Sequence, residues 1–188
     1  MRVIAGKYRS RRLQSLHGFD VRPSADRLRE TLFNVLTAGT PGALEGTVWL
    51  DLFAGTGAVG IEALSRGAGM VYFAESSPRA AELVRQNLKK LGVETGFQVL
   101  QQDVVRALPG LEKQEVVADF VFLDPPYRLS VAYEATLGAL AKSSLLKPES
   151  VVIAEHEKRF DPGEEFGALR RYRKLEQGDA ALSFYRAK

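Results

Sequence analysis

The sequence of 188 residues contains no cysteine, and it has only two histidines and one tryptophan. Without cysteine there is no disulfide framework, no thiolate zinc site and no mechanism that uses a cysteine nucleophile. His17 and His156 have no sequence neighbours that would pair with them as ligands or bases, so we expect both to be surface residues. We predict no metal site.

Long apolar runs are also absent. The sequence begins MRVIAGKYRSRR, which lacks the apolar core of a signal peptide, and no later run approaches the length that spans a bilayer. We therefore expect a cytoplasmic protein without membrane contact. The apolar and charged fractions, 45% and 26%, are ordinary for a globular protein of one domain.

Basic residues are concentrated at the start of the chain. Residues 1–29 hold eight Lys and Arg and two Asp, and subtracting these from the totals of 26 basic and 23 acidic residues leaves 18 basic and 21 acidic. A segment of this kind suits contacts with phosphates, and the alternative is a solvated edge hairpin whose charge prevents aggregation. The candidate RNA-binding residues are Arg2, Lys7, Arg9, Arg11, Arg12 and Arg22.

The most informative stretch is Asp124-Pro125-Pro126-Tyr127, which follows the apolar run 116–123. The run predicts a buried strand, and two prolines end it because proline offers no N–H to a strand ladder. The carboxylate, the free carbonyl of Pro125 and the aromatic ring then lie at the carboxyl edge of the sheet, where open α/β sheets bind ligands.

These groups suit the alkylation of a planar amine. Asp124 and the carbonyl of Pro125 would accept hydrogen bonds from the amine, orient it and offset the positive charge that grows on nitrogen. Tyr127 could stack on the ring that carries the amine. Amine methylation needs no covalent intermediate, unlike methylation of a pyrimidine carbon, which usually uses a thiolate. The alternative is a rigid turn with a surface Asp and a packed Tyr.

The rest of the chain predicts an α/β protein. We expect a basic hairpin of strands 2–5 and 8–13, a helix over 25–37 capped by Ser24, and a linker at 39–42. Strands and helices then alternate, as in a parallel sheet. The expected strands are 48–53, 70–74, 97–100, 116–123 and 151–154; the expected helices are 58–65, 78–91 and 131–141; and 169–175 with 180–186 form a closing antiparallel pair.

A glycine-rich turn follows the first predicted strand. In Asp51-Leu52-Phe53-Ala54-Gly55-Thr56-Gly57, the glycines let the backbone turn tightly beside the positive end of the next helix. Glu75 ends the second strand and could accept hydrogen bonds from ribose hydroxyls. With Gly60, this pattern formally satisfies the dinucleotide fingerprint, so NAD is a rival cofactor.

Two acidic residues favour S-adenosylmethionine over NAD. Asp51, just before the turn, could meet the cofactor's ammonium and would repel a pyrophosphate. Asp103, after the third strand and before Val104, could accept from an adenine amine, or it could simply cap the next helix.

With these motifs in this order, the chain resembles the class I S-adenosylmethionine-dependent methyltransferases, and its DPPY form is similar to those that methylate exocyclic or amide nitrogens. The stretches 2–9 and 22–34 further resemble the N-terminal signatures of the bacterial RsmD family, which methylates the N2 amine of one guanine in 16S ribosomal RNA. The resemblance covers essentially the whole chain. Glu75-Ser76-Ser77 departs from the usual acid-x-Asp/Asn run, which puts the role of Ser77 in doubt.

The resemblance implies a Rossmann-like sheet, mostly parallel with one reversed edge strand, and an N-terminal β-hairpin. It implies one domain, with the hairpin at 1–20, helix and linker at 21–42 and a catalytic core at 43–188. The partner is small-subunit rRNA, naked or within an assembling 30S particle, and we expect a monomer. The implied catalytic residues are Asp124, Pro125 and Tyr127, and the implied cofactor-binding residues are Asp51, Phe53, Gly55, Thr56, Gly57, Glu75, Asp103 and Val104.

Other functions stay open at this point. The same amine chemistry would serve a methyltransferase of DNA adenine or of protein glutamine. An NAD-dependent oxidoreductase and a catalytically silent RNA-binding module are the rivals from other classes. We take Glu155 and Glu157 as solvated acids, although both could line the cleft, and residues 170–174 could extend an RNA surface or protect an edge strand.

Overall fold

A computed structural model describes residues 1–15, 23–40, 42–126 and 130–188. In the described residues eight strands form one sheet in the order β3-β2-β1-β4-β5-β8-β7-β6. The strands are β1 (Val48–Leu52), β2 (Met70–Ala74), β3 (Phe97–Leu100), β4 (Ala118–Leu123), β5 (Leu146–Glu157), β6 (Glu165–Phe166), β7 (Leu169–Gln177) and β8 (Ala180–Ala187). The helices are α1 (Pro23–Thr37), α2 (Ala58–Ser65), α3 (Pro78–Leu91), α4 (Val104–Lys113) and α5 (Ser130–Leu140).

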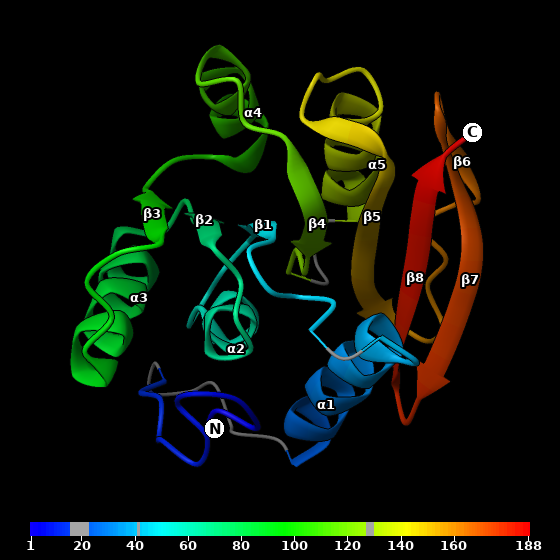
Figure 1. The fold of residues 1–188 in the computed structure, drawn as a ribbon. Coiled ribbons are helices and arrows are strands. Elements are labelled where there is room, and N and C mark those ends of the chain that lie inside the picture. The colour runs from blue at the N-terminus through cyan, green and yellow to red at the C-terminus, as the bar shows by residue number, and fades with distance from the viewer. Residues whose placement is uncertain (16–22, 41, 127–129) are drawn as a thin grey trace.

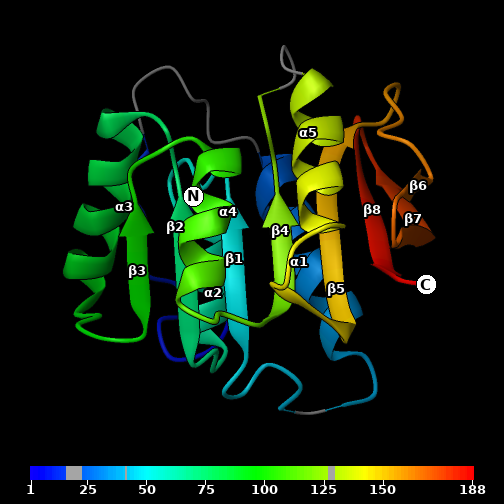
Figure 2. The ribbon, with the colours of Figure 1, turned by 90° about the horizontal axis from the view of Figure 1, so that it is seen from above.

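The helices cover the sheet on both faces, which gives three layers (Figure 1). Helices α4 and α5 lie on one face, and α1, α2 and α3 lie on the other together with the N-terminal segment, residues 1–15. Figure 2 shows the same layers from above. Each face has its own apolar core, because alternate residues of each strand point to opposite sides. Trp49 and Phe122 belong to the core under α1 and α2, and Leu50 and Leu123 to the other.

The parallel part of the sheet confirms the predicted α/β fold. Helix α2 and strands β2 and β3 have the predicted bounds. Helix α3 begins after Ser77, whose hydroxyl accepts the N–H of Ala80, and ends at Gly92 in the left-handed conformation. Trp49 is fully buried, as expected. Helix α1 begins at Pro23, two residues before the predicted start, and the side chain of Ser24, which was predicted to cap it, lies outside the described part of the structure.

The antiparallel part of the sheet is larger than predicted. β8 pairs antiparallel with β5, and β7 with β8, so the predicted pairing of 169–175 with 180–186 is confirmed. The expectation of one reversed edge strand was wrong, because β6 adds a further short antiparallel strand at the outer edge. β5 is longer than predicted: its first part pairs with β4, and its last six residues, 152–157, are also the pairing surface for β8.

The predicted N-terminal β-hairpin is not formed. The described residues 1–15 make a single antiparallel bridge, Arg2 to Arg12, with backbone hydrogen bonds from Val3 to Arg11, from Ser10 to Val3 and from Leu13 to Met1 beside it, and they form no pair of strands. The physical reason is that helix α2 takes the backbone groups that a hairpin would need. The Glu62 carboxylate accepts the N–H groups of Ile4 and Ala5 at 2.7 and 2.9 Å, and Ser65 Oγ accepts the N–H of Tyr8 at 2.9 Å.

The N-terminal segment is part of the folded core. Val3 and Leu13 are 1% and 7% exposed and pack in the same apolar cluster as Leu32 of α1 and Ile61 of α2. The segment therefore lies directly beside the helix that follows the glycine-rich turn. Among the described residues, no helix combines the length and hydropathy that crossing a membrane requires.

Candidate active site

Five acidic residues mark the carboxyl edge of the five parallel strands. Along the sheet their order follows the strands β3, β2, β1, β4 and β5. The chain turns out of the sheet at this edge, which is where ligands of such folds bind. The residues, in the same order, are Asp103, Glu75, Asp51, Asp124 and Glu155.

Asp51 is buried at the centre of this edge, on the face covered by α1 and α2. Its Oδ2 accepts the N–H of Gly60 at 2.9 Å, near the start of α2. Burial, with a smaller contribution from the negative charges of Asp124 and Glu75, raises the pKa of Asp51 to about 8, although the bond from Gly60 opposes the shift. The ionised form of Asp51 is therefore unfavourable in the ligand-free protein, and a bound cation would stabilise it.

Glu75 holds the glycine-rich turn in place. One carboxylate oxygen accepts the N–H of Gly55 at 2.9 Å, and the other accepts the N–H of Ser77 at 2.8 Å. The turn contains Phe53 at φ 62° and Gly57 at φ 75°, left-handed conformations that glycine adopts most readily. Glu75 thus binds the backbone of the turn, a role that its position in the sequence did not reveal.

Gly60 is required by packing rather than by the turn. A Cβ at this position would lie 2.3 Å from the ring of Phe73, because α2 lies close against β2. The carbonyl of Thr56 accepts a hydrogen bond at 3.0 Å from Asn87 of α3. The same amide also bonds both backbone groups of Gln14, which connects the N-terminal segment to the turn.

Asp103 lies at the far end of the edge and caps helix α4. Its carboxylate accepts the N–H of Arg106 at 3.3 Å, and its side chain is exposed. Val104 is buried beneath it. The structure therefore shows the capping role that the sequence allowed, and the capping carboxylate remains accessible from the edge.

Asp124 directly follows β4. Its N–H donates to the carbonyl of Leu52 at 3.4 Å, and Pro125 and Pro126 then end the ladder as predicted. Burial raises the pKa of Asp124 to about 7, so small changes in its surroundings near neutral pH can make this carboxyl gain or lose a proton. Tyr127 lies outside the described residues.

Glu155 belongs to the site, although its sequence context favoured a solvated acid. It is partly buried at the end of β5, and burial together with the charge of Asp124 raises its pKa well above the usual range, while Arg29 of α1 opposes the shift. Its signal in the sequence is its place at the end of an apolar strand. Glu157, two residues on, is exposed, as expected of a solvated acid.

The prediction that His156 is a surface residue was wrong. The side chain is fully buried on the α5 face, where its ring nitrogens contact Ser183 Oγ and the carbonyl of Glu157 at 2.9 and 2.8 Å. Burial lowers the pKa of His156. His17 lies outside the described residues. Within the part of the chain that the structure describes, no group of three His, Asp or Glu residues could hold a metal ion.

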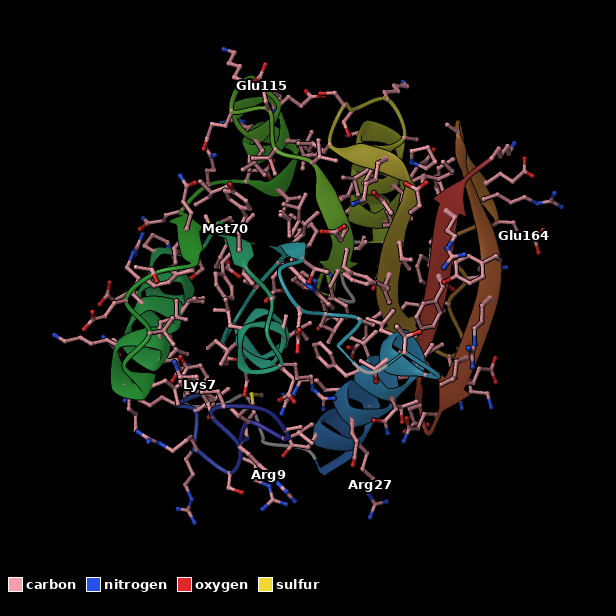
Figure 3. The ribbon with its side chains drawn as sticks, in the orientation of Figure 1. Lys7, Arg9, Arg27, Met70, Glu115 and Glu164 are labelled. Carbon is pink, nitrogen blue, oxygen red and sulfur yellow. The ribbon has the colours of Figure 1, made fainter. Side chains whose placement is uncertain are left out.

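The basic residues of the N-terminal segment point into solvent. Arg9 and, on α1, Arg27 extend from the lower face in Figure 3. The other candidate RNA-binding residues behave in the same way, except that Arg22 lies outside the described residues. The exposed members are Arg2, Lys7, Arg9, Arg11 and Arg12. On β7, by contrast, Arg171 and Lys174 form ion pairs with Asp161.

Comparison with known proteins places this geometry in a family. The family described as "Conserved hypothetical protein 95" matches residues 1–186. Ribosomal RNA small subunit methyltransferase D of Haemophilus influenzae is 36% identical over 159 residues, which cover 84% of this chain and 79% of that protein. The chain belongs to this RsmD-like methyltransferase family.

A second relative and two solved structures are also similar to this chain. YlbH of Bacillus subtilis, named as a candidate rRNA methyltransferase, is 34% identical over 186 residues, which cover 99% of this chain and 98% of that protein. The structure of protein TTHA0928 from Thermus thermophilus has a TM-score of 0.79 and 30% identity, and covers 98% of each chain. SMU.776, a methyltransferase by its description and solved with SAH, shares the fold at 14% identity and a TM-score of 0.69, covering 89% of this chain and 50% of that one.

Proposed function

We propose that this RsmD-like protein transfers a methyl group from S-adenosylmethionine to the N2 amine of a guanine in small-subunit (16S) ribosomal RNA. The observation that carries the proposal is Asp124, which lies beside Asp51 at the carboxyl edge of the sheet and is followed by two prolines that free the backbone carbonyl of Pro125. The names of its curated relatives support RNA of the small subunit as the substrate.

The acidic edge fits a cationic adenosyl cofactor. Asp51 has its pKa raised to about 8 by burial and by Asp124 and Glu75, and an ammonium or sulfonium would relieve this unfavourable charge. A pyrophosphate would add negative charge beside Asp51, which argues against NAD. When bound, the cofactor supplies an electrophilic methyl group. Asp51 and the turn 53–57, whose backbone Glu75 binds, would hold it, and the exposed carboxylate of Asp103 and the buried Val104 would lie on its β3 side.

Asp124 would act on the amine. Its carboxylate and the carbonyl of Pro125 would accept the two amine hydrogens, which turns the nitrogen lone pair away from the ring and towards the methyl group. The same carboxylate offsets the positive charge that forms on nitrogen. We assign Tyr127 the role of stacking on the extruded base.

Substituting Asp51 by Asn should stabilise the ligand-free protein at pH 8 and abolish cofactor binding. A carboxyl with a pKa of 3.8 when unfolded and about 8 when folded makes stability fall as the pH rises between these values. The amide removes this loss and can still accept from Gly60. We expect the melting temperature of the variant to exceed that of the wild type by several degrees at pH 8, at about 2–4 °C per kcal/mol, and by less at pH 5. Equal melting temperatures at both pH values would contradict the assignment of the charge.

The experiment that tests the function uses isotopically labelled S-adenosylmethionine and undermodified small ribosomal subunits. The RNA is digested to nucleosides and analysed by mass spectrometry, and labelled N2-methylguanosine is the expected product. Label found only in DNA adenine or protein glutamine, offered in parallel, would keep the amine chemistry and reject the substrate. Failure to bind the cofactor in calorimetry, with binding of NAD instead, would reject the proposal altogether.

The N-terminal segment should be tested by charge rather than by deletion. Because Val3 and Leu13 are buried in the core, removal of the segment would expose the apolar surface under α2. Replacing exposed Arg9 and Arg12 by Gln removes charge alone, and we expect RNA affinity to fall and its salt dependence to become shallower while cofactor affinity is unchanged. Lys113→Gln in the last turn of α4, exposed and on the other face of the sheet, is the control outside the segment.

A further inference from the structure

Glu155 and Asp124 are neighbours at the point where β4 ends. Strands β4 and β5 are parallel, and Leu123 is paired with Ala154, so the residues that follow this pair are the two acids, Asp124 directly after β4 and Glu155 within β5. Leu123 and Ala154 pack under α4 and α5. Because side chains alternate along a strand, both carboxyls point to the opposite face, the one covered by α1 and α2.

Among the described residues, the cation that acts on Glu155 is Arg29, and its Nη2 is already engaged. Arg29 of α1 is 5% exposed and lowers the pKa of Glu155, but its Nη2 donates to Asp26 Oδ1 at 3.0 Å and to the carbonyl of Arg2 at 2.5 Å. Its Nε also lies 3.8 Å from a Glu62 carboxylate oxygen.

Ionisation of both carboxyls is therefore unfavourable in the ligand-free protein. Burial raises the pKa of Asp51 and of Glu155, and Asp124 adds to both shifts as a like charge. Two neighbouring carboxyls in such surroundings resist ionising together, so we expect the pair to hold a proton at neutral pH when no cofactor is bound.

We propose that Glu155 shares with Asp124 the proton that leaves the substrate amine, so that the two carboxyls act as one proton acceptor. This inference rests on the proposed function. The amine nitrogen uses its lone pair to form the N–C bond while the C–S bond breaks and its electron pair stays on sulfur. The nitrogen, now positively charged, releases one N–H proton to the Asp124–Glu155 pair, and the sulfonium becomes a neutral thioether.

The change of charge on sulfur sets the timing of this proton transfer. A sulfonium near the pair favours its fully ionised form, so the pair gives up its proton when the cofactor binds. Loss of the positive charge on methyl transfer raises the proton affinity of the pair at the moment when the amine has a proton to lose. A site with Asp124 alone would have less capacity for that proton.

Calorimetry can test this without turnover. We would titrate the protein with S-adenosylmethionine and separately with S-adenosylhomocysteine at pH 7, in two buffers of different ionisation enthalpy, and obtain the protons released on binding. The two ligands differ by the methyl group and the sulfonium charge. We expect S-adenosylmethionine to release roughly half a proton more than the homocysteine. Asp51, whose pKa is raised to about 8 mainly by burial, also releases a proton to a bound cation and contributes to this difference. Glu155→Gln should therefore lower the difference, and Glu155→Asp should keep it.

Glu157→Gln is the matched control, because this exposed acid ends the same strand, and it should behave as the wild type. Equal proton release by the two ligands in the wild type would overturn the inference and leave the proposed function standing. A difference that is undiminished in Glu155→Gln would assign the proton elsewhere and overturn it too. If neither ligand binds the wild type, the proposed function fails, and the inference fails with it.

Discussion

Asp124→Ala should lose methyl transfer by a factor of about 10²–10³ while binding the cofactor normally. The carboxylate is expected to act on the amine through hydrogen bonds that strengthen as positive charge grows on nitrogen, and removal of one such preorganised group costs rate rather than affinity. Single-turnover measurements with saturating RNA report the chemical step. Asp124→Asn keeps an acceptor oxygen but not the charge, and should lie between the wild type and the alanine variant.

The control for this prediction is Glu115→Gln in the connection between α4 and β4. Its side chain is exposed and lies before the start of β4, at the opposite end of that strand from Asp124. Its turnover should equal that of the wild type. An unchanged rate in the alanine variant would show that Asp124 takes no part in the chemistry. Loss of cofactor affinity and melting temperature together with the rate would show that its role is structural.

Glu62→Ala should destabilise the protein by roughly 3–5 kcal/mol and weaken RNA binding. Glu62 is fully buried in α2, where its carboxylate accepts from the backbone of Ile4 and Ala5 and from Arg66 Nε at 2.8 Å, so its removal leaves buried donors and cations uncompensated. The melting temperature should fall by about 2–4 °C per kcal/mol. RNA affinity should fall because the N-terminal segment loses its attachment.

Glu82→Ala on α3 is the matched control for this loss. Glu82 is exposed and pairs with Arg85 at 3.6 Å, so its removal should change the free energy of unfolding by less than about 1 kcal/mol. If Glu62→Ala melted at the wild-type temperature, Glu62 would not anchor the N-terminal segment. If it melted lower but bound RNA with wild-type affinity, the segment would not form the RNA contact.

Local patterns in the sequence determined the parallel half of the fold. The apolar β-branched runs, the glycine-rich turn and the Ser77-Pro78 start with Gly92 at the end of α3 specified β2, β3 and α2–α3 within short windows, because strand burial and helix capping depend on nearby residues. The order of acids and prolines at the strand ends was also enough to place Asp51 and Asp124 at one edge of the sheet.

Contacts between distant residues decided the rest. The N-terminal segment has the alternation of a hairpin, but Glu62 and Ser65, more than 50 positions away, take its backbone N–H groups and hold it against α2. Glu155 is an ordinary acid in the sequence, and only the register of β4 with β5 brings it beside Asp124. Residues become neighbours across a sheet through strand pairing, which no short window of sequence specifies, so the carboxyl pair and the anchored segment could come only from the tertiary structure.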